Sequence, residues 1–142
     1  MVTATDQPRV VLVTGATRGI GRAVAEGLAA RGHVVFLGSR DLDRGRATTR
    51  DIPGDVRVTL IDVTDRNAIR RTHDLVREEF GDLDGLVNNA AINVSWDVPP
   101  RQTRIEDMRA VFDTDVFGAV EVTRAFIPPP ARISLPSRCE RL

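Results

Sequence analysis

The amino-acid sequence predicts an α/β protein built on a doubly wound parallel sheet. Short runs of β-branched residues alternate with longer stretches of helical periodicity, which is the pattern of successive βαβ units. A glycine-rich turn directly follows the first apolar run, so a strand, a turn and a helix are expected there in succession. The length of 142 residues fits one domain of this kind.

The first βα unit begins with an expected strand at Arg9–Val13, where aliphatic residues follow one another. Helical periodicity then extends over Gly19–Arg31 and places apolar residues on one face of the helix. Gly32 is expected to end this helix as a C-cap residue, because glycine adopts the left-handed backbone conformation without strain.

The second unit is expected to contain a strand at His33–Leu37 and a helix at Leu42–Arg50. The pair Pro53-Gly54 marks a turn, because both residues favour turn conformations. A third strand is expected at Val56–Ile61, where β-branched residues recur.

The remaining elements follow the same alternation. Asp65 can N-cap a helix that extends to Phe80 and is closed by Gly81. A fourth strand is expected at about Gly85–Asn88. A loop with two adjacent prolines follows, and helical periodicity then extends over about Ile105–Phe126.

The folded domain is expected to span residues 1–127. Three consecutive prolines, Pro128, Pro129 and Pro130, must end any helix, because proline has no amide hydrogen to donate. Residues 128–142 have neither a helical nor a strand period and are interpreted as an irregular tail.

Composition and charge exclude several classes of function. The 20 basic residues are all arginine, since no lysine occurs, and 20 acidic residues match them, so no net field attracts nucleic acid or a membrane. No apolar run approaches the roughly 20 residues that span a bilayer, and no His/Cys cluster has metal-ligand spacing. The single Cys139 and the absence of a secretory signal pattern predict a cytoplasmic protein.

The run Thr14-Gly15-Ala16-Thr17-Arg18-Gly19-Ile20-Gly21 predicts a phosphate site. Backbone N–H groups of such a turn and of the following helix point at one spot, and the helix dipole favours negative charge there. The glycines allow a pyrophosphate to approach the backbone. Their spacing resembles the TGxxxGxG signature of the short-chain dehydrogenase/reductase family. This resemblance implies a Rossmann-type sheet of about four strands in the order 3-2-1-4, with flanking helices.

The end of the second strand governs the choice between the two nicotinamide cofactors in this type of fold. Ser39 stands where NAD-binding proteins have an acidic residue, and Arg40 follows it. Together with Arg18 in the glycine turn, Arg40 could hold a 2′-phosphate, so NADP(H) is favoured over NAD(H). Asp41 leaves an alternative open, because a small backbone shift could present it to a ribose. In a further alternative, both arginines are solvated surface charges.

Two further motifs resemble the family at the expected places. Asp62-Val63 follows the third strand, where the family binds adenine, although Asp62 could instead cap the turn into the next helix. The run Asn88-Asn89-Ala90-Ala91 resembles the family's NNAG, with an alanine replacing the glycine. The cofactor-binding residues that the resemblance implies are Gly15, Thr17, Arg18, Gly19, Ile20, Gly21, Ser39, Arg40, Asp62, Val63, Asn89, Ala90 and Ala91.

The substrate side of the resemblance is incomplete. Asp115, three residues before Gly118, stands where the family has the asparagine of its catalytic tetrad, which holds a water in a proton relay. In the alternative interpretation, Asp115 lies on a half-exposed helix face. The family's catalytic tyrosine and lysine have no counterpart, because the chain contains neither residue type. Ser137 is not favoured as the catalytic serine, since Pro136 would break the strand before it.

The resemblance covers about Arg9 to Ile127. It implies an oxidoreductase that transfers a hydride between NADP(H) and a small carbonyl or alcohol substrate, inactive as this chain. The alternative is a non-catalytic dinucleotide-binding module or an inert fragment. The change in composition at the three prolines is interpreted as the product of a frameshift or a premature stop. The fourth strand would then be an unprotected edge, at which Leu86-Val87 could pair with another copy in a homo-oligomer.

Overall fold

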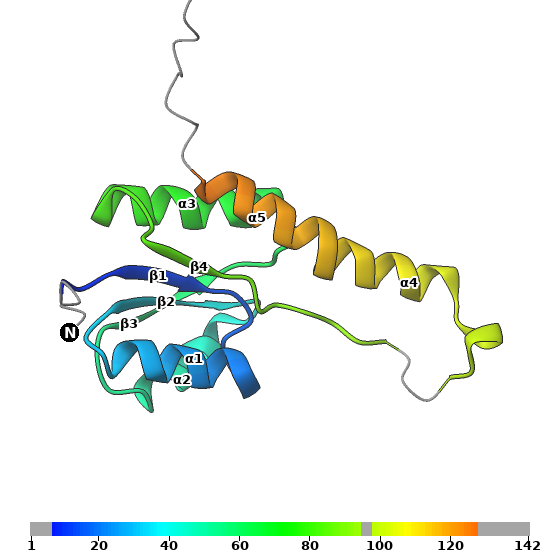
Figure 1. The fold of residues 1–142 in the computed structure, drawn as a ribbon, viewed down its shortest axis with the longest axis horizontal. Helices are drawn as coiled ribbons and strands as arrows, with labels where there is room; N and C mark the ends of the chain where they lie inside the picture. The colour runs from blue at the N-terminus through cyan, green and yellow to red at the C-terminus, as the bar shows by residue number, and fades with distance from the viewer. Residues whose placement is uncertain (1–6, 95–97, 128–142) are drawn as a thin grey trace, which may run out of the picture.

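The chain folds into three layers, with helices on both faces of one parallel sheet (Figure 1). The computed structural model describes residues 7–94 and 98–127. The sheet has the order β3-β2-β1-β4. Its strands are β1 (Val10–Val13), β2 (Val34–Ser39), β3 (Val56–Leu60) and β4 (Gly85–Val87). The predicted fold class and strand order are therefore confirmed.

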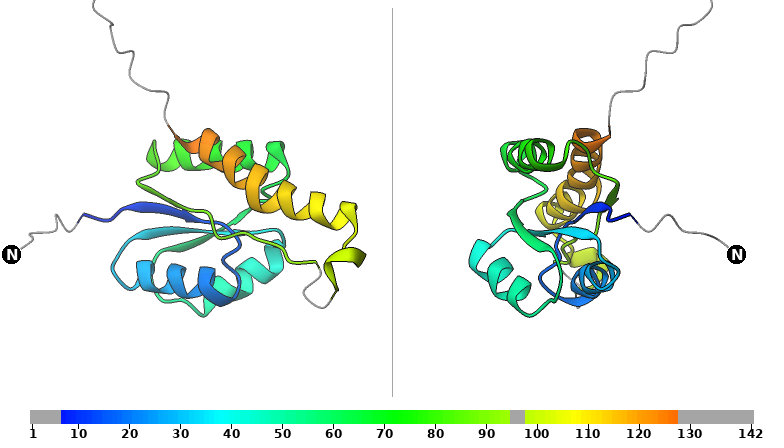
Figure 2. Two further views of the ribbon diagram at one scale, coloured as in Figure 1. Left: turned by 45° about the vertical axis from the view of Figure 1, so that its right-hand side comes forward. Right: turned by 90° about the vertical axis from the view of Figure 1, so that its left-hand side faces the viewer.

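The helices divide between the two faces of the sheet. Helices α1 (Gly19–Ala29) and α2 (Leu42–Arg50) cover one face, and α3 (Arg66–Phe80) and α5 (Ala119–Phe126) lie side by side on the other. The turned views of Figure 2 show the same division. This arrangement follows from right-handed crossovers that step from β1 to β2 and β3 in one direction along the sheet and from β3 back to β4 in the other.

Alternate residues of β1 belong to two separate hydrophobic cores, because successive side chains of a strand point to opposite faces of the sheet. Leu12 packs with Phe36, Ile69 and Val122 on the side of α3 and α5. The opposite core, on the side of α1, contains Val11, Val13, Ala25, Ala29, Val35, Leu37 and Ile52. Leu12 and Val13 are fully buried. The sheet is thus a rigid platform whose strand ends position the loops above it.

The predicted bounds of an element agree with the structure where residues nearby in the sequence determine them. They differ where pairing with a neighbouring strand determines them. Helix α2 has the predicted bounds, and Asp65 caps α3 as expected, accepting a hydrogen bond from the Asn67 N–H over 2.8 Å. Strand β2 begins and ends later than predicted, because its ladder with β3 continues as far as Ser39↔Leu60. Helix α1 ends at Ala29, before the predicted Arg31.

The expected helix at 105–126 is continuous but not uniformly α-helical. It consists of α4 (Ile105–Val111), a π-helical segment η2 (Phe112–Gly118) and α5. A 3₁₀ turn, η1 (Pro100–Gln102), precedes it. The π-helical segment lies where Gly118 meets the loop after β3: a Cβ at Gly118 would stand 2.7 Å from Val63 Cγ2. A uniform helical period in the sequence does not reveal such a segment.

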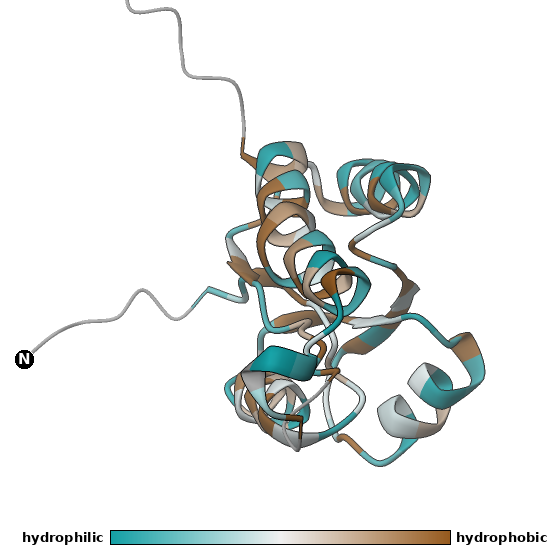
Figure 3. Cartoon of the chain, turned by 90° about the vertical axis from the view of Figure 1, so that its right-hand side faces the viewer, coloured by the Kyte–Doolittle hydropathy of each residue, from teal (hydrophilic) through white to brown (hydrophobic). Residues whose placement is uncertain are grey.

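The amino-terminal half of this helix extends beyond the sheet (Figures 1 and 2). No residue of α4 is buried. Large apolar side chains are exposed along α4, η2 and α5, and Figure 3 colours the hydrophobic residues of these helices brown. We call this set the α4 apolar face: Ile105, Met108, Phe112, Val116 and Val120. Among the described residues, no helix has the length and apolar character needed to cross a membrane.

Some predictions lie outside the described residues. These are the irregular tail at 128–142, the three prolines and Ser137. Within the described part of the chain, β4 pairs with β1 on one side, and no strand pairs with its other edge. The expectation of an edge strand at Leu86-Val87 therefore holds for this part of the structure.

Candidate functional site

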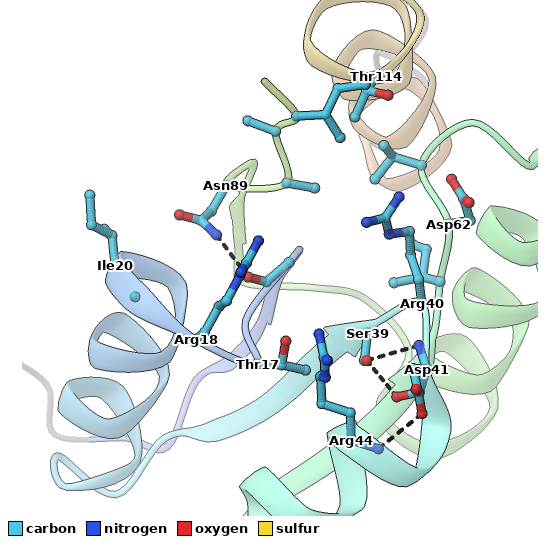
Figure 4. Close-up of a pocket in the computed structure, with 17 residues that line it drawn as sticks. Thr17, Arg18, Ile20, Ser39, Arg40, Asp41, Arg44, Asp62, Asn89 and Thr114 are labelled. Atoms are coloured by element: carbon cyan, nitrogen blue, oxygen red, sulfur yellow. Dashed lines mark hydrogen bonds between the residues drawn. The ribbon is translucent and has the colours of Figure 1, made fainter. Parts of the chain in front are cut away.

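A pocket of about 440 Å³ lies at the carboxyl ends of the strands. Every predicted cofactor-binding residue except Gly21 lines it. Five further residues line it, of which only Asp41 was a candidate from the sequence: Asp41, Arg44, Ile61, Ile92 and Thr114. Figure 4 shows that these side chains come from the glycine turn, the ends of β2 and β3, the loop after β4 and η2. Residues spread over a hundred positions are therefore gathered at one opening, at the edge of the sheet where open α/β folds bind ligands.

The glycine turn is shaped to leave its backbone accessible. Gly19 has a φ of 57°, and a Cβ built on it would meet no atom within 4 Å, so only open space lies above it. Gly21 is constrained from the other side, because a Cβ there would stand 2.3 Å from the Asn89 amide nitrogen. Gly19 therefore leaves the backbone of the turn open to a ligand, and Gly21 allows the start of α1 to pack directly against Asn89.

Asn89 and Thr14 join the glycine turn to the loop after β4. The Asn89 side-chain nitrogen donates hydrogen bonds to the carbonyl oxygens of Thr14 and Gly15, each over 3.0 Å. The Thr14 hydroxyl oxygen accepts from the backbone N–H groups of Asn89 and Ala90, also over 3.0 Å. Thr14 is 1% exposed. No local signal in the sequence indicates this role of Thr14, because its partners lie about 75 positions away in the chain.

Ser39, the last residue of β2, and Asp41 are engaged in local hydrogen bonds. The Ser39 hydroxyl donates to the Asp41 carbonyl oxygen over 2.6 Å and accepts from the Asp41 N–H over 3.1 Å. The Asp41 carboxylate accepts a hydrogen bond from the Arg44 N–H over 3.0 Å and thereby N-caps α2. One Asp41 oxygen is thus engaged in the cap, while the other accepts no hydrogen bond from the described residues, so the alternative in which Asp41 receives a ribose stays open.

Asp62 combines a structural role with a free acceptor. One carboxylate oxygen accepts from the Thr64 N–H over 2.9 Å and from the Thr64 hydroxyl over 2.7 Å. The capping role that the sequence left open is therefore present. The other carboxylate oxygen accepts no hydrogen bond from the described residues. Because Asp62 and Val63 both line the pocket, they can also receive a ligand there.

Three arginines line the pocket: Arg18, Arg40 and Arg44. Among the described residues, none of their guanidinium groups forms an ion pair, whereas Arg22, Arg46 and Arg57 do. Two carboxylates, those of Asp41 and Asp62, share the pocket with them. The lining therefore has an excess of positive charge, as an anion site requires.

Asp115 anchors a loop. Its carboxylate accepts a hydrogen bond from the backbone N–H of Ile92 over 2.9 Å, joining η2 to the segment after β4. Its neighbour Thr114 and its partner Ile92 line the pocket, whereas Asp115 itself does not. A role in a proton relay stays a prediction of the resemblance. No group of three or more metal-ligating side chains occurs in residues 7–94 and 98–127.

Comparison with known proteins agrees with this geometry. The family model described as short chain dehydrogenase matches residues 9–132, which is most of the chain. The chain belongs to the short-chain dehydrogenase family. The family resemblance inferred from the glycine turn is thus confirmed.

Curated members of the short-chain dehydrogenase family resemble most of this chain. The short-chain dehydrogenase anuI of Penicillium roqueforti is 36% identical over 124 residues, which are 84% of this chain and 48% of that protein. The NADP-dependent 3-hydroxy acid dehydrogenase YdfG of Salmonella typhi is 33% identical over 119 residues, again 84% and 48%. The chain spans about half the length of these relatives.

Solved structures of short-chain dehydrogenases share the fold. One from Streptomyces avermitilis has a TM-score of 0.75 at 31% identity, covering 88% of this chain and 45% of that one. A metagenomic short-chain oxidoreductase in complex with NADP has a TM-score of 0.78 at 30% identity, covering 86% and 57%. The four-stranded sheet and its helices are therefore those of the short-chain dehydrogenase family.

Proposed function

We propose that this chain binds NADP(H) in the pocket above β1, β2 and β3, as the cofactor-binding part of an NADP(H)-dependent carbonyl or alcohol oxidoreductase. One observation carries the choice of cofactor. One oxygen of the Asp41 carboxylate caps α2, while the Arg18 and Arg40 guanidinium groups line the pocket without an ion pair among the described residues. A ribose 2′-phosphate suits such cations, whereas a free 2′-hydroxyl calls for an acidic acceptor.

The residues of the pocket fit each part of the dinucleotide. The glycine turn and the first turn of α1 offer backbone N–H groups to the pyrophosphate, and the open space above Gly19 leaves room for it. The free oxygen of Asp62 and the backbone of Val63 would receive the adenine. Asn89, Ala90 and Ala91 also line the pocket, and the ribose of the nicotinamide half would lie against them. The relative YdfG is described as NADP-dependent, which supports this choice.

Catalysis is a separate matter. When bound, the nicotinamide ring supplies or accepts a hydride. Short-chain dehydrogenases transfer the accompanying proton with a tyrosine assisted by a lysine, and these 142 residues contain neither. We therefore expect the polypeptide to bind cofactor without turnover, as the dinucleotide-binding module considered above would. The substrate class stays a proposal, and so does a cytoplasmic location.

We also propose that copies of this chain associate. The free edge of β4 exposes unpaired backbone groups in the described part of the chain, and such edges recruit further strands. The α4 apolar face adds a second exposed hydrophobic area, with Phe112 50% exposed. Burial of this area in a second copy would be favourable.

Titration of the full chain with NADPH and with NADH, followed by nucleotide fluorescence, tests the cofactor proposal. We expect saturable binding of NADPH that is at least about 10-fold tighter than binding of NADH, since each charge-assisted bond to phosphate contributes about 1.5–3 kcal/mol. In parallel, NADPH oxidation with a panel of aldehydes and ketones should stay at the background rate. Binding of NADPH that is equal to or weaker than binding of NADH would overturn the cofactor assignment. Turnover of a carbonyl compound would overturn the proposal that the chain binds cofactor without catalysis.

A further inference from the structure

Arg44 is the one pocket arginine that neither the glycine turn nor the end of β2 supplies. It lies in the first turn of α2, and its side chain points toward Ser39 and Thr17 in Figure 4. We infer that Arg44 is a specificity-determining residue, a third guanidinium that holds the 2′-phosphate of NADP(H) and discriminates against NAD(H). This inference rests on the proposed function and goes beyond the two arginines on which that proposal depends.

The backbone of Arg44 is held on both sides. Its N–H donates to the Asp41 carboxylate over 3.0 Å, and its carbonyl oxygen accepts from the Thr48 hydroxyl over 2.9 Å. Thr48 is 5% exposed, and its hydroxyl also lies 3.4 Å from the Thr17 carbonyl oxygen in the glycine turn. The start of α2 is therefore tied to the turn that would hold the pyrophosphate.

The residue after Arg44 brings α2 close to the sheet. Gly45 is buried, and a Cβ on it would stand 2.3 Å from Val58 Cγ2 and 3.1 Å from Ser39 Cβ. Only a glycine permits this approach without displacing α2 or β3. The first turn of α2 consequently lies against the end of β2, and the Arg44 guanidinium reaches the same opening as Arg40.

Charge favours a third cation at this place. A phosphate monoester carries about −1.5 to −2 charges at pH 7, and the Asp41 carboxylate in the same lining adds one more, so Arg18 and Arg40 do not neutralise both. The Arg44 side chain is exposed and has no ion-pair partner among the described residues. Arg46, two positions later, differs on this point, because its guanidinium lies 3.8 Å from an Asp43 carboxylate oxygen and it does not line the pocket. Arg44 is thus free for an anion, and Arg46 is a matched control.

Calorimetric titration of the full chain with 2′,5′-ADP and with 5′-AMP separates the 2′-phosphate from the rest of the nucleotide. We expect Arg44→Ala to weaken 2′,5′-ADP binding by about 10- to 100-fold, the loss of one or two charge-assisted hydrogen bonds. Binding of 5′-AMP should change by less than about 2-fold, since no 2′-phosphate contact is lost. Arg46→Ala should leave both affinities within the same limit, and Arg44→Lys should restore part of the 2′,5′-ADP affinity, because lysine keeps the charge but not the planar fork.

Each outcome has a defined meaning. If the unaltered chain discriminates between the two nucleotides and Arg44→Ala does so equally well, the inference is wrong while the proposed function stands. If Arg44→Ala weakens both nucleotides alike, Arg44 acts through the structure of α2, and the inference is again wrong. If the unaltered chain fails to bind NADPH and 2′,5′-ADP, the proposed function itself fails, and the inference fails with it.

Discussion

The side-chain nitrogen of Asn89 lies 3.0 Å from the carbonyl oxygen of Gly15 and donates a hydrogen bond to it. This contact joins the loop after β4 to the glycine turn after β1. It fixes the spacing between the two walls of the pocket, and it explains why the start of α1 leaves no room for a side chain at Gly21.

Asn89→Asp should lower NADPH affinity by at least about 10-fold and the free energy of unfolding by about 1–3 kcal/mol, because a carboxylate cannot donate to two carbonyl oxygens. Fluorescence titration and denaturant unfolding measure the two effects. Asn88→Asp is the matched control: Asn88 donates to the Thr123 hydroxyl over 2.9 Å and does not line the pocket. Its NADPH affinity should be unchanged, and equal losses in both variants would contradict the role given to Asn89.

Gly21→Ala should destabilise the chain and weaken NADPH binding, because the new methyl group meets the Asn89 amide and the Gly15 carbonyl oxygen, 2.8 Å away. In the same helix, a methyl group at Gly27 would meet only the flexible end of Arg31 at 3.4 Å. Gly27→Ala should therefore raise stability by up to about 1 kcal/mol and leave NADPH affinity unchanged. Thermal unfolding with and without NADPH tests both, and a Gly21→Ala variant that binds normally would contradict the close approach.

Asp115→Ala should cost about 1–2 kcal/mol of stability, since it leaves the Ile92 N–H without its acceptor. Asp115→Asn keeps an acceptor oxygen at the same place, and its stability should stay within about 0.5 kcal/mol of the unaltered chain. Urea unfolding distinguishes the two variants. Equal destabilisation by both would show that the negative charge, rather than the hydrogen bond, is what the loop needs.

Arg57 links β3 to the end of α3. Its guanidinium pairs with the carboxylates of Asp55 and Glu79 and lies 4.8 Å from the centre of the Phe80 ring. Arg57→Ala should lower the free energy of unfolding by about 1 kcal/mol at pH 7, since surface pairs and cation–π contacts contribute modestly. Urea unfolding measures this, with Arg50→Ala as an exposed control that forms no ion pair among the described residues.

The pair with Asp55 also predicts a pH dependence. The hydrogen bond from Arg57 holds the pKa of the Asp55 carboxyl below its ordinary value of 3.8. The pair therefore stabilises the fold fully above that value, and the contribution disappears as pH falls through the lower pKa of the folded state. The stability difference between the unaltered chain and Asp55→Asn should be constant from pH 7 to about pH 5 and shrink in more acidic buffer. A difference that grew with acidity would contradict this sign.

Phe112→Gln should weaken self-association at least about 10-fold, because a large exposed apolar side chain is lost from each copy. Light scattering across a concentration series measures it. Leu75→Gln is the control, since Leu75 is also exposed, at 37%, but lies on α3 outside the α4 apolar face. An unaltered chain that stays monomeric at high concentration would contradict the proposed association.

Local signals were sufficient for much of the fold. The bounds of α2 and the cap of α3 were predictable because they depend on residues within one turn, such as the Asp65 carboxylate and the Asn67 N–H. The pocket lining was largely predictable because motif spacing reports which strand ends share one edge of a parallel sheet. The end of β2 was not, since Ser39 belongs to the strand only through its pairing with Leu60.

Three features could not be predicted in the same way: the π-helical segment, the hydrogen bonds of Thr14 with the loop after β4, and the position of Arg44. The segment η2 lies where Gly118 contacts Val63 and Asp115 accepts from Ile92, and both contacts join residues far apart in the chain. Arg44 reaches the pocket because Gly45 packs on Val58. Long-range contacts of this kind leave no periodic pattern in the sequence.

The sequence by itself determined the family, the strand order and the glycine turn, because motif spacing and hydrophobic period reflect backbone geometry within single βα units. The tertiary structure decided which charges remain free for a ligand. Asp41 and Asp62 each use one carboxylate oxygen in a local hydrogen bond, and the pocket arginines form no ion pair among the described residues. The physical reason is that hydrogen-bond partners are chosen by distance in space, and that distance exists only after the elements have packed.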